Sequence, residues 1–144
     1  MEADFVENRQ ISEICWETTY EAMMNEAHKI MEMKSPNSEV VVLKNQSGQY
    51  FCIGIPDIMD NIISELRENL LIKQLIKCGD TRVMTCLCTM NGEYPEIPSW
   101  HLRSRLAEIN PENLQTKTFL WGGGEDIIVK PFSALLPLKK KESK

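Results

Sequence analysis

The chain has few of the residues from which metal and catalytic sites are usually built. Only two histidines occur among its 144 residues, and its five cysteines form no Cys-x-x-Cys pair. The common zinc-ligand spacings are therefore absent. A Gly-x-Ser-x-Gly nucleophile elbow is missing as well. We expect no metal and no cofactor, and no motif assigns a catalytic residue.

Long apolar runs are also missing. No stretch approaches the roughly 20 apolar residues that span a bilayer. The acidic start, residues 1–5, lacks the basic and apolar segments of a signal peptide. An odd number of cysteines favours reduced thiols over a disulfide framework. These features predict a cytoplasmic protein without membrane association.

Charge is unevenly distributed along the chain. Residues 1–80 carry 14 acidic and 7 basic groups, whereas residues 81–144 carry 7 acidic and 9 basic groups. The first 33 residues hold 8 acids against Arg9 and Lys29. A chain without a basic footprint is a poor candidate for direct nucleic-acid binding. Its acidic region favours a basic protein partner instead.

Apolar periodicity predicts three helices, over residues 10–33, 56–78 and 100–109. The second helix is expected to turn Ile62, Leu66 and Leu70 toward the core. Its apolar phase then shifts, which predicts a kink or a second short helix near Asn69. Ser99 is expected to cap the third helix.

Five strands are predicted, over residues 39–44, 49–55, 82–90, 117–121 and 126–130. The three glycines at 122–124 favour a hairpin turn over a phosphate-binding loop, because a strand and not a helix follows them. The order α-β-β-α-β-α-β-β predicts an α+β fold with an antiparallel or mixed sheet and two or three helices packed on it. We expect one domain over residues 1–137 and a basic tail over 138–144.

Four sulfur side chains recur at alternate positions of the third strand: Met84, Cys86, Cys88 and Met90. Alternation in an extended strand would place them on one face. Soft ligands of this kind suit Cu(I) or zinc. However, α-carbons two residues apart in a strand are separated by about 6.6 Å, and ligands of one ion must converge. We therefore favour core packing, with a soft-metal protein as an alternative.

A small enzyme is the other alternative. Folding could bring Cys86 or Cys88 to His101 and Glu96, because catalytic groups are assembled in space and not by sequence order. A reactive cysteine would have a depressed pKa. No spacing in the chain requires this arrangement.

The favoured function is a small acidic binding or regulatory protein that acts by protein–protein contact. Its sharper version is an inhibitor of a basic partner that handles nucleic acid. The motivation is the acidic first helix, whose glutamates recur every four residues and form an exposed ridge. The candidate partner-binding residues are Glu13, Glu17, Glu21, Trp100, His101, Arg103, Arg105 and Trp121.

Overall fold

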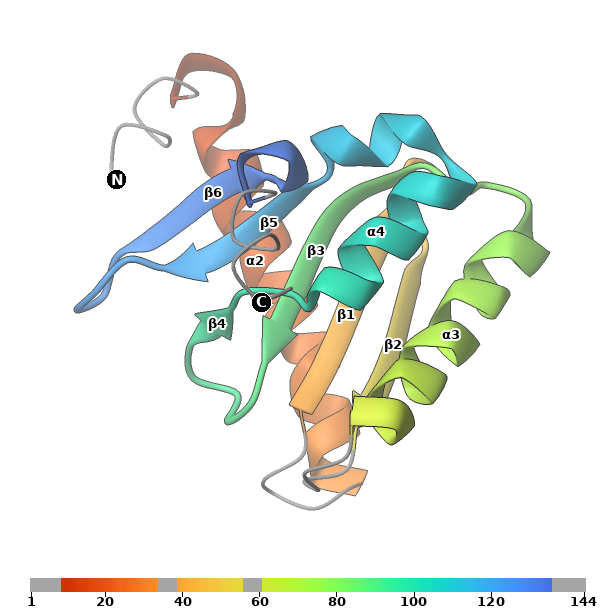
Figure 1. Ribbon diagram of the computed structural model, residues 1–144. Coiled ribbons are helices and arrows are strands. Elements are labelled where there is room, and N and C mark those ends of the chain that lie inside the picture. The colour runs from red at the N-terminus through yellow and green to blue at the C-terminus, as the bar shows by residue number, and fades with distance from the viewer. Residues whose placement is uncertain (1–8, 34–38, 56–60, 136–144) are drawn as a thin grey trace.

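A computed structural model describes residues 9–33, 39–55 and 61–135. It shows a mixed sheet with helices on both faces (Figure 1). The helices are α2 (Arg9–Met33), α3 (Asn61–Cys78) and α4 (Trp100–Ile109), with 3-10 turns η1 (Pro111–Gln115) and η2 (Phe132–Leu135). The strands are β1 (Glu39–Asn45), β2 (Tyr50–Ile55), β3 (Val83–Thr89), β4 (Pro95–Glu96), β5 (Lys117–Trp121) and β6 (Ile127–Pro131). The predicted α+β class and the single domain are confirmed.

The sheet has the strand order β2-β1-β3-β5-β6, and the short β4 pairs with β3. β1 is antiparallel to both β2 and β3, and β5 is antiparallel to β6. β3 and β5 are parallel, so the chain between them must cross over, and α4 lies in this connection. The hairpin turn predicted at the three glycines is confirmed, because β5 and β6 flank it in register. In the described residues, no helix has the length and apolarity that a membrane span requires.

Helix α2 covers one face of the sheet, whereas α3 and α4 cover the other (Figure 1). Met23 and Ala27 of α2 are fully buried, as the apolar stripe of this helix predicts. Trp16 and Tyr20 meet the ring of Phe119 edge-on, at 6.1 and 5.1 Å between centroids. Such aromatic contacts anchor the first half of α2 on the sheet.

Helix α3 does not present the predicted face to the core. Ile62, Leu66 and Leu70 are 68%, 58% and 45% exposed. The buried side of α3 is its second apolar stripe, Leu71, Ile72 and Leu75, together with Glu68. The prediction of a second short helix from near Asn69 is wrong too, because α3 continues as one helix from Asn61 to Cys78. Residues 56–60, where the helix was predicted to begin, lie outside the described part.

The sulfur row divides into two pairs. Cys86 and Cys88 are fully buried against the α3 and α4 side, which confirms core packing for the two thiols. Met84 and Met90 are 41% and 38% exposed, which the alternation did not predict. At the start of β3, Lys44 pairs with Thr85 but the next residue of β1 pairs with Val83. Met84 is therefore the extra residue of a bulge and leaves the regular pleat.

Candidate active site

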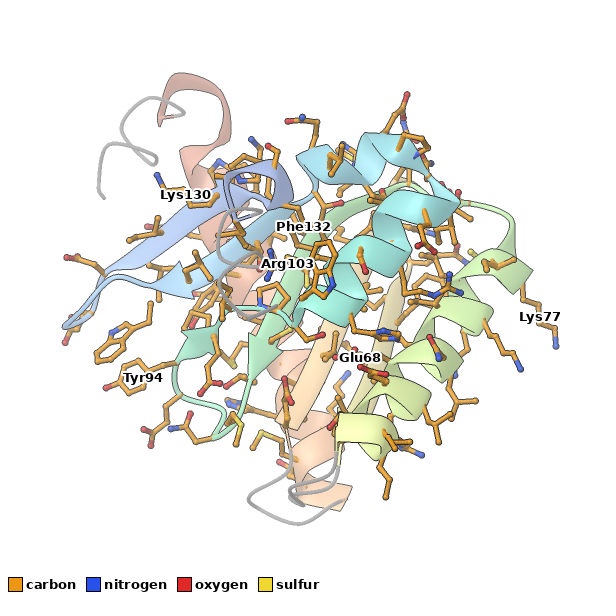
Figure 2. All side chains as sticks on the ribbon, in the orientation of Figure 1. Glu68, Lys77, Tyr94, Arg103, Lys130 and Phe132 are labelled. Atoms are coloured by element: carbon orange, nitrogen blue, oxygen red, sulfur yellow. The ribbon has the colours of Figure 1, made fainter. Side chains whose placement is uncertain are left out.

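A buried carboxyl group lies where α3 passes the start of α4. Glu68 of α3 is only 2% exposed (Figure 2). The hydroxyl of Ser99 contacts both carboxyl oxygens, at 2.8 Å to Oε2 and 3.0 Å to Oε1. The same hydroxyl accepts a hydrogen bond from the backbone N–H of Leu102 at 3.0 Å. Ser99 therefore caps α4, as predicted, and also joins the helix to Glu68.

Burial raises the pKa of Glu68 from 4.5 to about 7. The hydrogen bond from Ser99 opposes this rise, and the charges of Glu39 and Glu65 add to it. Desolvation disfavours the ionised form of a carboxyl, so the neutral acid persists to near-neutral pH. A group with such a pKa can both donate and accept a proton under physiological conditions.

Two further glutamates are coupled to this carboxyl in sequence, since Glu39 acts on Glu68 and Glu96 acts on Glu39. Burial raises the pKa of Glu39, and the charge of Glu96 raises it further. Burial also raises the pKa of Glu96. Glu39 opens β1, and Glu96 pairs with Cys88 at the carboxyl end of β3. We call Glu39, Glu68 and Glu96 the carboxyl cluster.

A second polar link joins α3 to α4 beside the cluster. His101 Nε2 lies 3.1 Å from the side-chain oxygen Oδ1 of Asn69, so the imidazole donates this hydrogen bond. Asn69 follows Glu68, and His101 lies two residues after Ser99. The Ser99–Glu68 and His101–Asn69 hydrogen bonds therefore hold the same part of α3 against the start of α4. His101 was predicted as a surface contact for a partner, yet it is partly buried and serves this junction.

The thiols do not complete a nucleophilic site. The pKa of Cys88 lies well above its ordinary value. The largest cause is a hydrogen bond with Cys86, and the next is burial. A raised pKa is the opposite of what an activated thiolate requires. The hydrogen bond described for His101 goes to Asn69 and not to a thiol. Among the described residues, no group of three or more His, Cys, Asp or Glu is placed to hold a metal ion.

The other predicted site residues are spread over the molecule. Arg103 is 2% exposed, so it does not belong to a surface patch as predicted. Arg105 pairs with Glu108 at 2.6 Å on the exposed side of α4. Trp121 is 49% exposed and contacts the ring of Tyr94 at 4.6 Å.

The acidic ridge and Trp100 lie elsewhere. Glu17 and Glu21 are exposed on α2, and Trp100 is partly buried at the start of α4. Glu13 belongs to α2, but its side chain lies outside the described part. As a surface for a partner, these residues stay a prediction.

Sequence reasoning missed Glu68, although the chain contains a signal for it. Glu68 stands three, four and seven residues before Leu71, Ile72 and Leu75, which is the spacing of one helix face. An acid on an apolar stripe must be paired or neutral when buried. Reading the second phase of this helix as the buried one would have identified it.

Comparisons with known proteins connect this fold to a class of enzymes. No protein-family model matches the chain, and no curated protein sequence matches it significantly. Among solved structures, 19 chains match. The cytidine deaminase of Bacillus anthracis aligns at 20% identity with a TM-score of 0.59, over 81% of this chain and 86% of its own.

Two other matches agree. The cytidine deaminase of Mycobacterium leprae aligns at 19% identity and a TM-score of 0.59, over 82% of this chain and 97% of its own. The cytidine deaminase of Burkholderia pseudomallei aligns at 17% identity and a TM-score of 0.58, over 81% of this chain and 95% of its own. At these identities the likeness establishes the fold. The prediction of a regulatory or inhibitory binding protein is overturned, because these structures of the same fold are enzymes, and the enzyme alternative gains support.

Proposed function

We propose that this protein is a small enzyme that acts on a pyrimidine nucleoside or a related ring, with Glu68 as its proton-transferring group. The fold shared with cytidine deaminases supports the substrate class. The observation that carries the proposal is Glu68 itself, a carboxyl that is 2% exposed with a pKa of about 7. Strongly shifted pKa values of this kind gather at functional sites. A cytoplasmic location belongs to the same proposal.

The residues present do not fit a zinc centre of the kind found in nucleobase deaminases. Such enzymes hold zinc with His-x-Glu and Pro-Cys-x-x-Cys motifs. This chain has neither motif, and its nearest counterpart is Pro98-Ser99-Trp100-His101-Leu102. Serine and leucine stand there in the two cysteine positions. The serine hydroxyl is already bonded to Glu68, and the leucine is fully buried. The proposed chemistry therefore uses this chain's own acid.

A neutral carboxyl suits the polar edge of a cytosine-like ring. Its O–H can donate to a ring nitrogen, while its carbonyl oxygen accepts from the neighbouring amino group. Ser99 orients the carboxyl by contacting both oxygens, and its hydrogen bond keeps the pKa from rising further. In hydrolytic deamination, Glu68 donates its proton to the ring nitrogen and takes one from the water that adds at the amino-bearing carbon. It passes that proton to the amino group, which leaves as ammonia, and the new hydroxyl returns a proton to Glu68.

The test is turnover and binding of cytidine, deoxycytidine and cytosine, followed by proton NMR and calorimetry between pH 5.5 and about 8.5. We expect activity with an apparent pKa near 7, the value of Glu68. Glu68→Gln should lower the rate by about 100-fold or more, since positioned acid–base groups commonly contribute that much. Glu125→Gln, an exposed change on the turn between β5 and β6, is the matched control and should leave the rate unchanged.

Two results would contradict the proposal. One is an absence of binding and turnover for all three pyrimidines at millimolar concentration. The other is a Glu68→Gln variant that is as active as the Glu125→Gln control. Activity that survives a strong chelator is expected, and its loss would contradict the metal-free assignment.

A further inference from the structure

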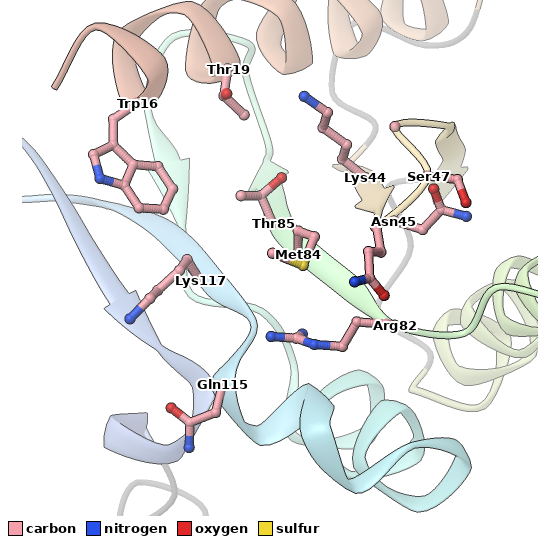
Figure 3. Close-up of a pocket in the computed structure, with 12 residues that line it drawn as sticks. Trp16, Thr19, Lys44, Asn45, Ser47, Arg82, Met84, Thr85, Gln115 and Lys117 are labelled. Atoms are coloured by element: carbon pink, nitrogen blue, oxygen red, sulfur yellow. The ribbon is translucent and has the colours of Figure 1, made fainter. Parts of the chain in front are cut away.

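A second site lies at the opposite end of the sheet from Glu68. Here the amino ends of β3 and β5 and the carboxyl end of β1 meet under the first turns of α2 (Figure 3). The cavity between them has a volume of about 610 Å³. That size lies within the range of pockets that hold small organic ligands.

Three cations line this cavity, and each comes from a different strand or strand end: Lys44 of β1, Arg82 before β3, and Lys117 of β5. Among the described residues that line the cavity, none is an Asp or a Glu. This is unexpected in a chain with a net charge of −5. Concentrated positive charge in a concave site attracts anions, and three charges match a phosphate group better than a single carboxylate.

Arg82 is held in a fixed position at the wall. Its guanidinium donates to the carbonyl of Val83 and lies 3.4 Å from Asn113 Oδ1 and 3.5 Å from Thr116 Oγ1. Figure 3 shows it extending from the start of β3 toward β5. Its ion pair with Glu112 is long, at 3.8 Å, and the Glu112 side chain is 77% exposed. An ion pair of this kind is weak enough to leave the guanidinium's charge available.

The two lysines are less engaged. Lys44 lies over the ring of Tyr50 at 5.6 Å. Within the described residues, the side-chain ammonium of Lys117 has no hydrogen bond or ion pair. Both side chains can therefore turn toward a ligand at little cost in broken contacts.

The remaining wall is apolar and aromatic. Met84, the bulged residue of β3, is 41% exposed and lies at the cavity floor. Trp16 of α2 forms the opposite side (Figure 3). Its indole nitrogen Nε1 is buried and has no hydrogen-bond acceptor among the described residues. An adaptable thioether and an indole beside three cations fit a ligand with a flat apolar body as well as a charged end.

We infer that this cavity binds a small organic phosphate of the nucleoside diphosphate class. The phosphates lie at Lys44, Arg82 and Lys117, and the ring lies between Trp16 and Met84. The bulge at Met84 has a role in this arrangement, because it removes one side chain from the core and presents it to the ligand. The site is separate from Glu68 and does not depend on the function proposed there.

The experiment is isothermal titration of the full chain with ADP, CDP, pyrophosphate and adenosine, at low and at physiological salt. We expect saturable binding of the diphosphates that weakens with salt. Pyrophosphate and adenosine should each bind at least about tenfold more weakly, because each offers only one part of the ligand. Equal binding of pyrophosphate and ADP would overturn the organic part of the assignment.

Charge reversal locates the site. Lys117→Glu should weaken ADP binding about tenfold or more, since one hydrogen bond to a charged group contributes a change of that size. Lys73→Glu, an exposed change on α3 outside the cavity, is matched in net charge and should have no effect. If Lys117→Glu does not fold by circular dichroism, Lys44→Glu takes its place. Equal affinities in the reversal and control variants, or no diphosphate binding at millimolar concentration, would overturn the proposal.

Glu68→Gln serves as a separate control. It should bind ADP like the unchanged protein, because its side chain does not line the cavity. Failure of the diphosphate site would therefore leave the nucleoside reaction at Glu68 untouched, and the reverse also holds.

Discussion

The two ends of β3 have opposite charge. Three glutamates from three elements meet near its carboxyl end, and three cations from three elements meet near its amino end: Glu39, Glu68 and Glu96 against Lys44, Arg82 and Lys117. Strand β1 runs antiparallel to β3 and therefore contributes to both groups, with an acid at its start and a lysine near its end. One central pair of strands thus separates the charges along its length.

The two ends also differ in burial. At the acidic end, burial raises the pKa of all three carboxyls. At the cationic end the charged groups line an open cavity, where water can solvate and screen them. The comparison shows that holding a proton requires burial, whereas attracting an anion requires only concentrated charge. The predictions below test this difference, beginning with the largest effect.

Arginine at the acidic end should be far more important for stability than arginine at the cationic end. Arg103 is buried and donates to the carbonyls of Pro98 and Leu135 at 3.1 and 3.0 Å. Arg103→Ala leaves both carbonyls without this donor and should cost about 3 kcal/mol or more in the free energy of unfolding. In Arg82→Ala, the carbonyl of Val83 keeps the hydroxyl of Thr116 at 2.6 Å. That change should cost about 1 kcal/mol.

Urea unfolding of both variants measures the difference. Arg105→Ala is the control on α4, because its ion pair with Glu108 is exposed and should contribute less than about 1 kcal/mol. If Arg103→Ala and Arg82→Ala lowered the free energy of unfolding by similar amounts, the two ends of β3 would not differ as a buried and a solvated end.

The second prediction concerns pH. The pKa of Glu68 is raised from 4.5 to about 7 on folding, so the folded chain holds this proton more tightly than the unfolded chain. The stabilisation is therefore complete below pH 4.5 and is lost as pH rises through about 7. Between these limits the protein should lose about 3 kcal/mol relative to Glu68→Gln.

The difference in stability between the unchanged protein and Glu68→Gln isolates the contribution of Glu68, because the pKa values of Glu39 and Glu96 are raised in both proteins. Chemical unfolding at a series of pH values measures it. The stability of Glu125→Gln, which changes an exposed acid, should follow that of the unchanged protein at every pH. Parallel curves for Glu68→Gln as well would mean that folding does not shift the pKa of Glu68.

Much of the fold could be predicted from local patterns. The helix over Trp100–Ile109 and its Ser99 cap were predicted with the bounds that the structure shows, because capping and periodicity are both local. The face of α3 was wrong because its sequence contains two apolar phases. Local periodicity cannot say which of them the sheet will cover. The unpredicted exposure of Met84 has a similar cause, since a bulge depends on the partner strand.

The candidate sites were harder to predict because both depend on contacts between distant segments. Glu68 meets Ser99 across 31 positions of the chain. The cationic cavity joins residues that the sequence spreads over three strands and a helix. The cysteines drew attention because they are conspicuous in one strand, yet they pack in the core. Conspicuous residue types were a poor guide here, and one ordinary glutamate on an apolar stripe was the better signal.

The smallest expected effect concerns the hydroxyl that joins cap and carboxyl. Ser99→Ala removes the N-cap of α4 and a donor to Glu68, which should cost about 1–2 kcal/mol. Because the hydrogen bond from Ser99 lowers the pKa of Glu68, its loss should move the midpoint of the pH difference above 7. Ser104→Ala, whose hydroxyl donates to the carbonyl of His101, should change neither quantity. A loss of stability with no movement of the midpoint would assign Ser99 to the helix alone, and the acidic end would then owe its proton to burial without help from the cap.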